Sequence, residues 1–187
     1  MKSLIRKSAL KFKPFFVFIF SLFFEKKYLK GKHFDNSFYG LKCGIRAIWT
    51  RNILRISRPY PFPVVLGCHI SNPEKINFHP DDLNNFQSPG TYFQNFSAEI
   101  TLGKGVYIGP NVGLITANHN LKDPDLHEPG KPIVLKEKCW IGMNAVILPG
   151  VILGPRTIVA AGAVVANSFP KGGVMIGGVP AKVIKEV

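Results

Sequence analysis

His119 is well suited to proton transfer, because the imidazole of a histidine gains and loses a proton near neutral pH. Three carboxylates follow it in the same segment, at Asp123, Asp125 and Glu128. A histidine oriented by such a partner can act as a general base on an attacking hydroxyl group, which contributes on the order of 10² to 10⁴ in rate. Nearby backbone carbonyl groups compete for the same role, so the residues alone do not identify the partner. A histidine in a polar loop more often has no special function. The sequence around His119 must therefore show whether it is catalytic.

The cysteines do not suggest a second chemistry. Cys43, Cys68 and Cys139 lie far apart, without the spacing of a zinc site or a nearby histidine partner. We therefore expect reduced thiols, a cytoplasmic protein and no metal.

The charge of the chain is strongly segregated. The net charge is +13, and residues 1–60 carry 14 cations and 2 anions, whereas the remainder carries 10 and 9. The nearly neutral remainder argues against a nucleic-acid-binding surface. We expect a basic N-terminal extension over residues 1–60 and a separate domain over residues 61–187.

The extension contains two apolar segments flanked by cations. Residues 14–24 read PFFVFIFSLFF, which is shorter than the roughly 20 residues that a spanning helix needs. Residues 41–57 place apolar side chains at helical spacing among arginines, which is typical of a helix lying in a membrane interface. A helix packed on the rest of the protein is the alternative. We expect peripheral contact with the inner face of the cell membrane through residues 1–60.

A six-residue period begins after Pro61. Apolar side chains recur at this spacing in two sets, Leu102, Ile108 and Leu114, then Leu135, Ile141, Ile147, Leu153, Val159 and Val165. Four places after these residues stands a column of small or β-branched side chains, Val106, Val112, Cys139, Ala145, Val151, Thr157 and Ala163. A period of six fits neither a helix nor a simple alternating strand, and stacked hexads would bury a core that no single repeat could bury.

Each hexad also carries a turn signal. Gly or Asn, which tolerate a left-handed backbone, stand three places after the apolar residue at Gly105, Asn111, Asn144, Gly150 and Gly162, with Lys138 and Arg156 as exceptions. The same lattice extends backward more faintly, through Leu66, Phe78 and Phe96. Each hexad therefore predicts a short strand followed by a tight corner.

The lattice is interrupted around His119. The step from Leu114 to Leu135 is three hexads plus three residues, so it cannot stay on the six-residue period. The segment between them is rich in proline, so we expect a loop at about residues 116–132 that projects from the coil and carries the histidine.

These motifs resemble the hexapeptide-repeat acetyltransferases. The resemblance rests on IGPNVGLITANH at 108–119, on CWIGMNAVILPGVILGPRTIVAAGAVV at 139–165 and on GGVPAKVIK at 177–185. Within that family the chain is most similar to the maltose and galactoside O-acetyltransferases and to surface-polysaccharide O-acetyltransferases with extra N-terminal sequence. The resemblance implies an all-β fold, a left-handed parallel β-helix with an N-terminal helical extension here, that assembles as a homotrimer with active sites between subunits.

The resemblance also implies an activity and its residues. His119 would be the general base for acetyl transfer from acetyl-CoA to a saccharide hydroxyl group, in surface-polysaccharide or lipid-linked glycan synthesis. The implied substrate-binding residues are Asn95, Trp140 and Glu128, where Trp140 should face outward from its place just before Ile141. The implied acetyl-CoA-binding residues are Gly142, Ala160, Ala161, Lys182 and Lys185.

Three alternatives stay open. An N-acetyltransferase acting on an amino sugar or a xenobiotic would need the same base. A γ-class carbonic anhydrase shares this coil but needs three histidines on a zinc ion, and its histidine spacing is not present. A catalytically silent scaffold coil is the third.

Overall fold

A computed structural model describes residues 13–187, and the chain divides into two compact units between Leu66 and Gly67. The first twelve residues of the predicted extension lie outside the described residues.

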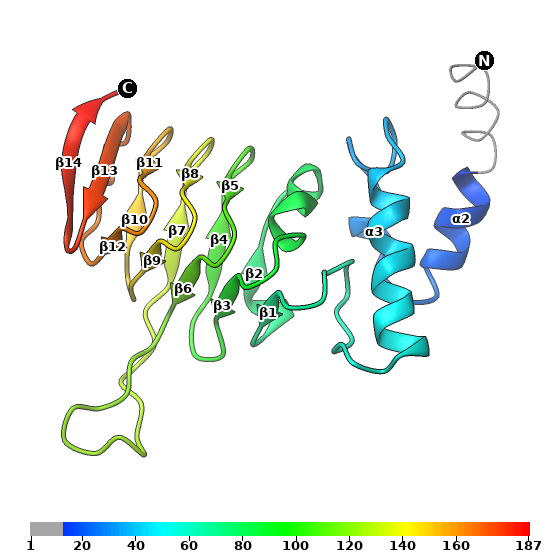
Figure 1. Ribbon diagram of the computed structural model, residues 1–187, viewed down its shortest axis with the longest axis horizontal. Helices are drawn as coiled ribbons and strands as arrows, with labels where there is room; N and C mark the ends of the chain where they lie inside the picture. Colours follow the sequence, from blue (N-terminus) through cyan, green and yellow to red (C-terminus); the bar gives the residue numbers. More distant parts are fainter. Residues whose placement is uncertain (1–12) are drawn as a thin grey trace. The chain divides into compact units, whose positions relative to one another are not determined.

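The second unit is a coil of three sheets (Figure 1). The first sheet contains β1 (His69–Ile70), β3 (Tyr92–Gln94), β6 (Gly113–Ile115), β9 (Val146–Ile147) and β12 (Val164–Val165). The second contains β2 (Ile76–Asn77), β4 (Ile100–Leu102), β7 (Ile133–Leu135) and β10 (Ile152–Leu153). The third contains β5 (Tyr107–Ile108), β8 (Trp140–Ile141), β11 (Ile158–Val159), β13 (Val174–Gly178) and β14 (Ala181–Glu186). Two 3-10 helices, Pro73–Lys75 and Pro80–Phe86, lie in the early turns.

Successive turns of the coil stack in register. Ile141 of β8 pairs in parallel with Ile108 of β5 on one side and with Val159 of β11 on the other. Ile141 and Val159 are three hexads apart, so each complete turn uses one hexad per sheet. The predicted fold, a left-handed β-helix of hexapeptide repeats, is confirmed.

Both predicted columns fill the interior. The large apolar side chains from Leu102 to Val165 are buried, and the column of small side chains from Val106 to Ala163 is at most 1% exposed. Alternate strand residues point outward, and Trp140 is 55% exposed, as its lattice position predicts. At roughly 25 cal/mol per Å² of apolar surface, this interior is the main source of stability for strands only two or three residues long.

The corners adopt a left-handed backbone at every predicted position. The φ angle is +79° at Gly105, +56° at Asn111 and +82° at Gly150. The two exceptions in residue type, Lys138 and Arg156, adopt φ angles of +57° and +59°. Stacking against neighbouring turns therefore imposes the corner even where the side chain disfavours it by roughly 1–2 kcal/mol.

The backward extension of the lattice is wrong. Leu66 and Phe96 are more than 40% exposed, and the early interior is filled instead by residues such as Ile70, Ile76 and Phe93. Ile70 pairs with Phe93, and the step between them is longer than the three hexads of a regular turn. The early turns therefore contain extra residues and lose the period of six.

The last strand closes the coil differently from the others. β13 pairs with β11 in parallel, whereas β14 turns back and pairs with β13 in antiparallel fashion. Sheet three therefore ends in a hairpin, and β14 is its edge strand.

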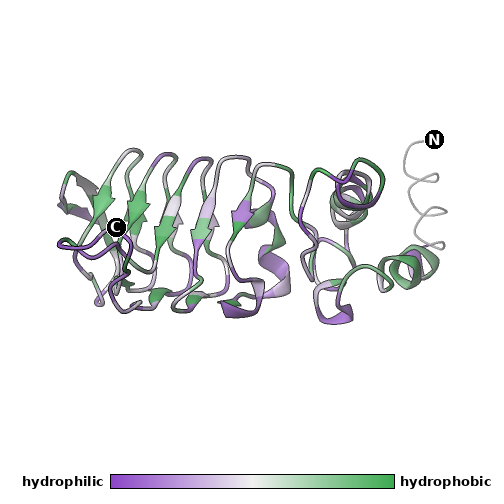
Figure 2. Cartoon of the chain, turned by 90° about the horizontal axis from the view of Figure 1, so that it is seen from below, coloured by the Kyte–Doolittle hydropathy of each residue, from purple (hydrophilic) through white to green (hydrophobic). Residues whose placement is uncertain are grey.

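The first unit is helical. It contains α2 (Lys13–Phe20), a 3-10 turn at Lys26–Tyr28, α3 (Tyr39–Ile48) and a π-helical turn at Trp49–Ile53. Helix α2 is mostly hydrophobic, and its residues from Phe15 to Phe20 are all apolar (Figure 2). Phe20 of α2 packs on Gly44 of α3, where a methyl group would collide with the phenyl ring.

Helix α3 buries a face of small residues against the rest of its unit. Its buried positions include Gly40, Cys43, Gly44 and Ala47. Among the apolar side chains that residues 41–57 place at helical spacing, Leu41 is buried. The side chains of Ile45 on α3, and of Trp49, Ile53 and Ile56 beyond it, are more than half exposed. Across residues 13–187, no helix combines the length and apolar character needed to cross a bilayer.

Candidate active site

The His119 loop leaves the coil after β6 and returns at β7, covering residues 116–132 (Figure 1). Gln94 of β3 holds its first residues: the Gln94 amide oxygen accepts hydrogen bonds from the N–H groups of Thr116 and Ala117 at 2.9 and 3.0 Å. The Gln94 amide nitrogen donates to the Ala117 carbonyl at 2.9 Å. Sequence reasoning missed Gln94, because an amide in a strand gives no signal of the loop that it supports.

The His119 ring is held by a backbone carbonyl group. Its Nδ1 atom lies 2.6 Å from the carbonyl oxygen of Pro124. A carbonyl oxygen only accepts hydrogen bonds, so this contact places the proton on Nδ1 and leaves Nε2 as the acceptor. Nε2 is the atom that a general base would use.

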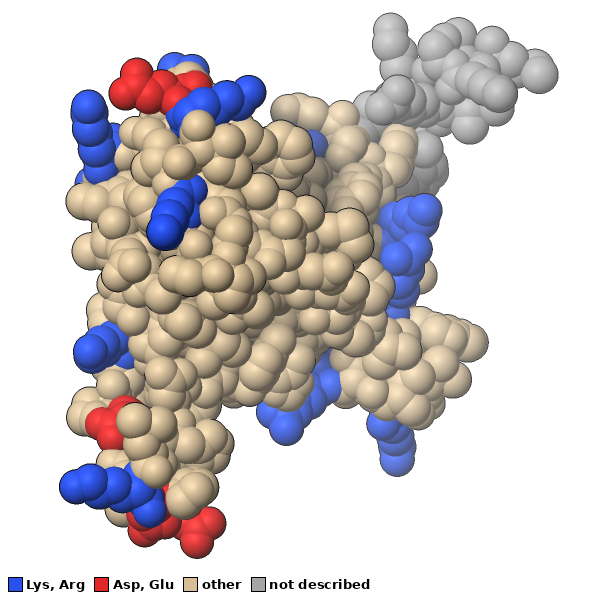
Figure 3. Space-filling model, turned by 60° about the vertical axis from the view of Figure 1, so that its left-hand side comes forward, with Lys and Arg blue, Asp and Glu red and all other residues tan. Residues whose placement is uncertain are grey.

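Two of the three loop carboxylates have other partners. Glu128 Oε1 accepts a hydrogen bond from the Asn120 side chain at 2.6 Å, and Asp123 Oδ1 accepts one from the Asp125 N–H at 3.1 Å. In the view of Figure 3, acidic side chains appear at the lower extremity, where the loop lies, while the broad face above it is mostly uncharged. These carboxylates therefore affect the conformation of the loop more directly than the orientation of the His119 ring.

His127 lies against His119. The two ring centroids are 4.2 Å apart with the planes tilted by 36°, and the two residues form an antiparallel bridge across the loop. The rings of Phe96 and His127 pack nearly perpendicular to each other, with centroids 5.1 Å apart. The sequence places His127 in the loop but does not show that it folds back on His119.

A hollow of about 490 Å³ lies at the base of the loop. It is lined by Asn118, Glu128, Pro129, Lys131, Leu148, Pro149 and Ala166. Its volume falls in the range of roughly 300–1,000 Å³ that is usual for small-molecule sites. Of the residues predicted to bind substrate, Glu128 is the one that lines this hollow.

Asn95 serves the coil itself. It is fully buried, its side-chain oxygen accepts a hydrogen bond from the Asn72 N–H at 2.9 Å, and its amide nitrogen donates to the Asn72 carbonyl at 2.6 Å. These bonds join two successive turns and favour a structural role over contact with a substrate.

The residues predicted to bind acetyl-CoA gather on the third sheet and beyond its strands. Of these, Ala160 and Ala161 follow β11, and the exposed Lys182 and Lys185 lie on the edge strand β14. Trp140, which was predicted to bind substrate, lies on β8 of the same sheet. Gly142 follows β8, but the space beside it is filled by the next turn, since an added Cβ would lie 2.6 Å from the Ala161 nitrogen. Its lack of a side chain therefore serves stacking within the coil.

The structure does not bring these residues together with His119 in one chain. His119 leaves from the first sheet, whereas Trp140 and Lys182 belong to the third. Among the described residues, no group of three His, Cys, Asp or Glu side chains is arranged to hold a metal ion.

The hexads of this coil match a known class of transferases. A family model described as bacterial transferase hexapeptide (six repeats) matches residues 132–167. Over 183 residues the chain is 32% identical to an Escherichia coli (strain K12) protein whose name assigns it to lipopolysaccharide biosynthesis as an O-acetyl transferase, and the match covers 79% of this chain and 90% of that protein. The chain belongs to the hexapeptide-repeat acetyltransferase family.

Two further proteins are similar to the chain over part of its length. The chain is 34% identical over 106 residues to a galactoside O-acetyltransferase of Escherichia coli (strain K12), covering 51% of each. It spans about half the length of this relative and of several other curated relatives that it matches. The solved structure of a point mutant of AntD, an N-acyltransferase from Bacillus cereus, matches with a TM-score of 0.51 at 15% identity, over 66% of this chain and 79% of that one, and shares the fold.

Proposed function

We propose that this protein transfers an acetyl group from acetyl-CoA directly to a hydroxyl group of a saccharide. The observation that carries the proposal is the 2.6 Å contact between His119 Nδ1 and the Pro124 carbonyl oxygen, which leaves Nε2 to act as the base. The hydroxyl oxygen attacks the thioester carbonyl carbon while Nε2 takes the hydroxyl proton. The carbon–sulfur bond then breaks, and the protonated ring returns its proton to the departing thiolate of CoA.

A saccharide acceptor is supported by the relatives, whose names refer to lipopolysaccharide biosynthesis and to galactosides. The hollow beside Glu128 is the proposed acceptor site, because it combines a carboxylate and a lysine with apolar walls. Asn95 is left out of this site, since both of its polar side-chain groups bond to Asn72.

The donor site is proposed to lie between subunits of a homotrimer. Trp140 would wall the acetyl pocket, and Ala160 and Ala161 would flank the pantetheine arm on the same sheet. Lys182 and Lys185 would contact CoA phosphates. Because His119 and Trp140 belong to different sheets of one chain, a neighbouring subunit that presents its third sheet to the His119 loop would complete the site. Gly142 contributes by letting the coil stack tightly at this point.

The first unit is proposed to make peripheral contact with the inner face of the cell membrane, through residues 1–60. The exposed apolar side chains on α3 and on the turn that follows it, flanked by basic residues, support this location. An acceptor carried on a lipid would then share the membrane surface with the enzyme.

Incubation with isotopically labelled acetyl-CoA and extracted cell-envelope glycans tests the reaction, with mass spectrometry to locate the acetyl group. An O-acetyl ester is removed by mild alkali, whereas an N-acetyl amide survives. Label in an alkali-stable amide would favour the N-acetyltransferase alternative, which uses the same base. Absence of label from both glycans and amino sugars would contradict the proposal.

A further inference from the structure

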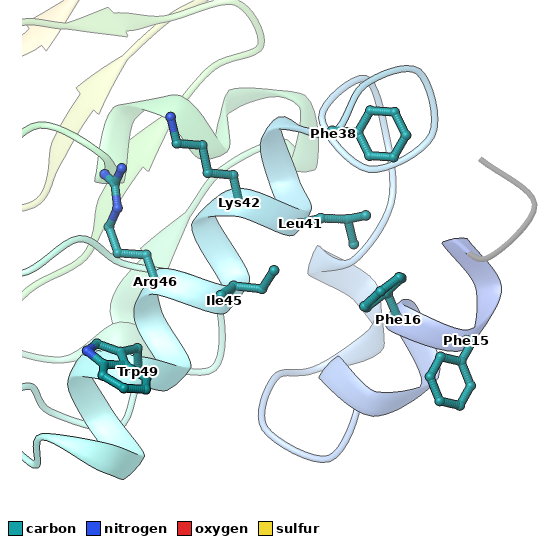
Figure 4. A pocket seen from close by; sticks show the side chains of 8 residues that line it. All are labelled: Phe15, Phe16, Phe38, Leu41, Lys42, Ile45, Arg46 and Trp49. Atoms are coloured by element: carbon teal, nitrogen blue, oxygen red, sulfur yellow. The ribbon is translucent and has the colours of Figure 1, made fainter. Parts of the chain in front are cut away.

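An open groove lies between α2 and α3 in the first unit (Figure 4). Its volume is about 1000 Å³, at the upper end of the roughly 300–1,000 Å³ that is usual for ligand sites. It is lined by Phe15, Phe16, Phe38, Leu41, Lys42, Ile45, Arg46 and Trp49. No step of the proposed acetyl transfer uses it.

The walls of this groove are hydrocarbon. Figure 4 shows Phe16, Leu41 and Ile45 directed toward the space between the two helices. The apolar surface continues outside the groove on α2 and the turn after it, where Phe18 and Leu22 are 65% and 71% exposed. Contiguous apolar surface of this kind marks a binding surface in a folded protein, because leaving it in water is unfavourable.

Two cations stand at the same groove. Lys42 and Arg46 are one helical turn apart on α3, so their side chains leave the same face. The two carboxylates of the described part of this unit have other partners: Glu25 pairs with Lys27 at 2.7 Å, and Asp35 accepts a hydrogen bond from the Gly31 N–H at 2.6 Å. A hydrocarbon groove edged by cations fits a ligand with an apolar chain and an anionic head.

We propose that this groove binds a hydrocarbon chain of an anionic phospholipid, with Lys42 and Arg46 at its phosphate group. This inference rests on the proposed membrane contact and deepens it, because it assigns that contact to a defined lipid-binding groove. A second copy of the chain is disfavoured as the occupant, since pairing this face with itself would bring like charges together. A phosphate-bearing lipid meets both the apolar walls and the basic edge.

The test uses the full chain and sucrose-loaded vesicles of phosphatidylcholine, either pure or mixed with phosphatidylglycerol as the minor component. Trp49 lines the groove and the other tryptophan is Trp140, so Trp140→Phe leaves one fluorescent reporter at the site. Phosphatidylglycerol with brominated acyl chains then reports whether the hydrocarbon of the anionic lipid reaches Trp49. The variant Lys42→Glu with Arg46→Glu tests the cations, and Lys136→Glu with Lys171→Glu, both exposed on the coil, is the matched control.

We expect phosphatidylglycerol to strengthen vesicle binding and brominated chains to quench Trp49. The Lys42→Glu and Arg46→Glu pair should weaken binding by at least ~10-fold, while the control pair changes it little. Ile45→Ser, at an exposed position where folding is tolerant, should reduce both binding and quenching. Circular dichroism checks that each variant is folded.

Three outcomes would overturn the inference. Vesicle binding without quenching of Trp49 would leave the membrane contact standing and remove the groove from it. Equal binding of both vesicle types, unchanged by the charge reversals, would remove the anionic lipid. A change in sedimentation coefficient on Ile45→Ser, with no binding to either vesicle, would identify a second copy as the occupant and contradict the membrane contact itself, while leaving acetyl transfer to a soluble acceptor untouched.

Discussion

The Nδ1 atom of His119 points at the carbonyl oxygen of Pro124, 2.6 Å away, across the turn of its own loop. This contact fixes both the orientation of the ring and the nitrogen that carries the proton. Because the partner belongs to the backbone, no substitution of a carboxylate should reproduce the loss of His119 itself. The same loop therefore carries both the base, His119, and the carbonyl group that orients it.

Replacing His119 with alanine should lower kcat by at least ~10²-fold, since the base is removed while the coil keeps its interior. Initial rates with acetyl-CoA and a saccharide acceptor measure the loss, and far-UV circular dichroism monitors folding. His69→Ala, which alters a histidine on β1 outside the loop, is the control. Near-normal turnover of the His119→Ala protein would remove this residue from the mechanism.

Replacing His127 with alanine should lower kcat by roughly 10-fold, because the ring that packs on His119 is lost and the base is less well positioned. His127→Phe keeps a flat ring at this place and should restore most of the rate. KM for acetyl-CoA should stay nearly constant in both variants. Equal losses in the alanine and phenylalanine variants would point to a chemical role for the imidazole.

Gly142→Ala should destabilise the coil by about 1–3 kcal/mol, because the new methyl group would lie 2.6 Å from the Ala161 nitrogen and 2.8 Å from the Val159 oxygen. Gly113→Ala is the matched control, since its methyl group meets only side-chain atoms 3.8 Å or more away. Urea denaturation of the two variants provides the comparison. Equal stability would show that the next turn moves aside freely.

The Cys139 thiol gives a pH dependence of known sign. Burial raises its pKa from about 9 to about 11, so the folded chain keeps the thiol proton that the unfolded chain loses above about pH 9. The stability that the neutral thiol provides is present below pH 9 and is lost as pH rises toward 11. Between pH 7 and 10, the wild type should therefore lose roughly 1–1.5 kcal/mol relative to Cys139→Ala. Denaturation under reducing conditions at both pH values measures this, and parallel losses would contradict it.

The regular part of the coil could be predicted because each structural position in a turn favours a recognisable type of residue. Each turn needs a large apolar residue, a small one and a corner, and between Leu135 and Val165 the sequence repeats that order without insertions. The early turns could not be predicted in the same way. Ile70 and Phe93 stack in the core although they are more than three hexads apart in the sequence. Extra residues in the corners interrupt the six-residue spacing but leave the buried positions filled.

The site was predictable to a smaller extent. His119 carries a recognisable motif, and the outward position of Trp140 follows from its neighbour Ile141. The partner of His119 could not be predicted, because every residue has a carbonyl group and only the fold of the loop selects that of Pro124. The hydrogen bonds between Asn95 and Asn72 could not be predicted for a similar reason, since they depend on how two turns of different length stack.

The hairpin that ends the third sheet bears on how the protein behaves in solution. The edge strand of a sheet carries unpaired backbone N–H and C=O groups, with which a strand of another molecule can pair. Natural proteins hinder this pairing with lysines on the edge strand. Lys182 and Lys185 occupy that strand here. Replacing both lysines to test phosphate binding would also remove this protection against pairing. A lost signal in such variants should therefore be checked for fibres by light scattering before it is attributed to weaker acetyl-CoA binding.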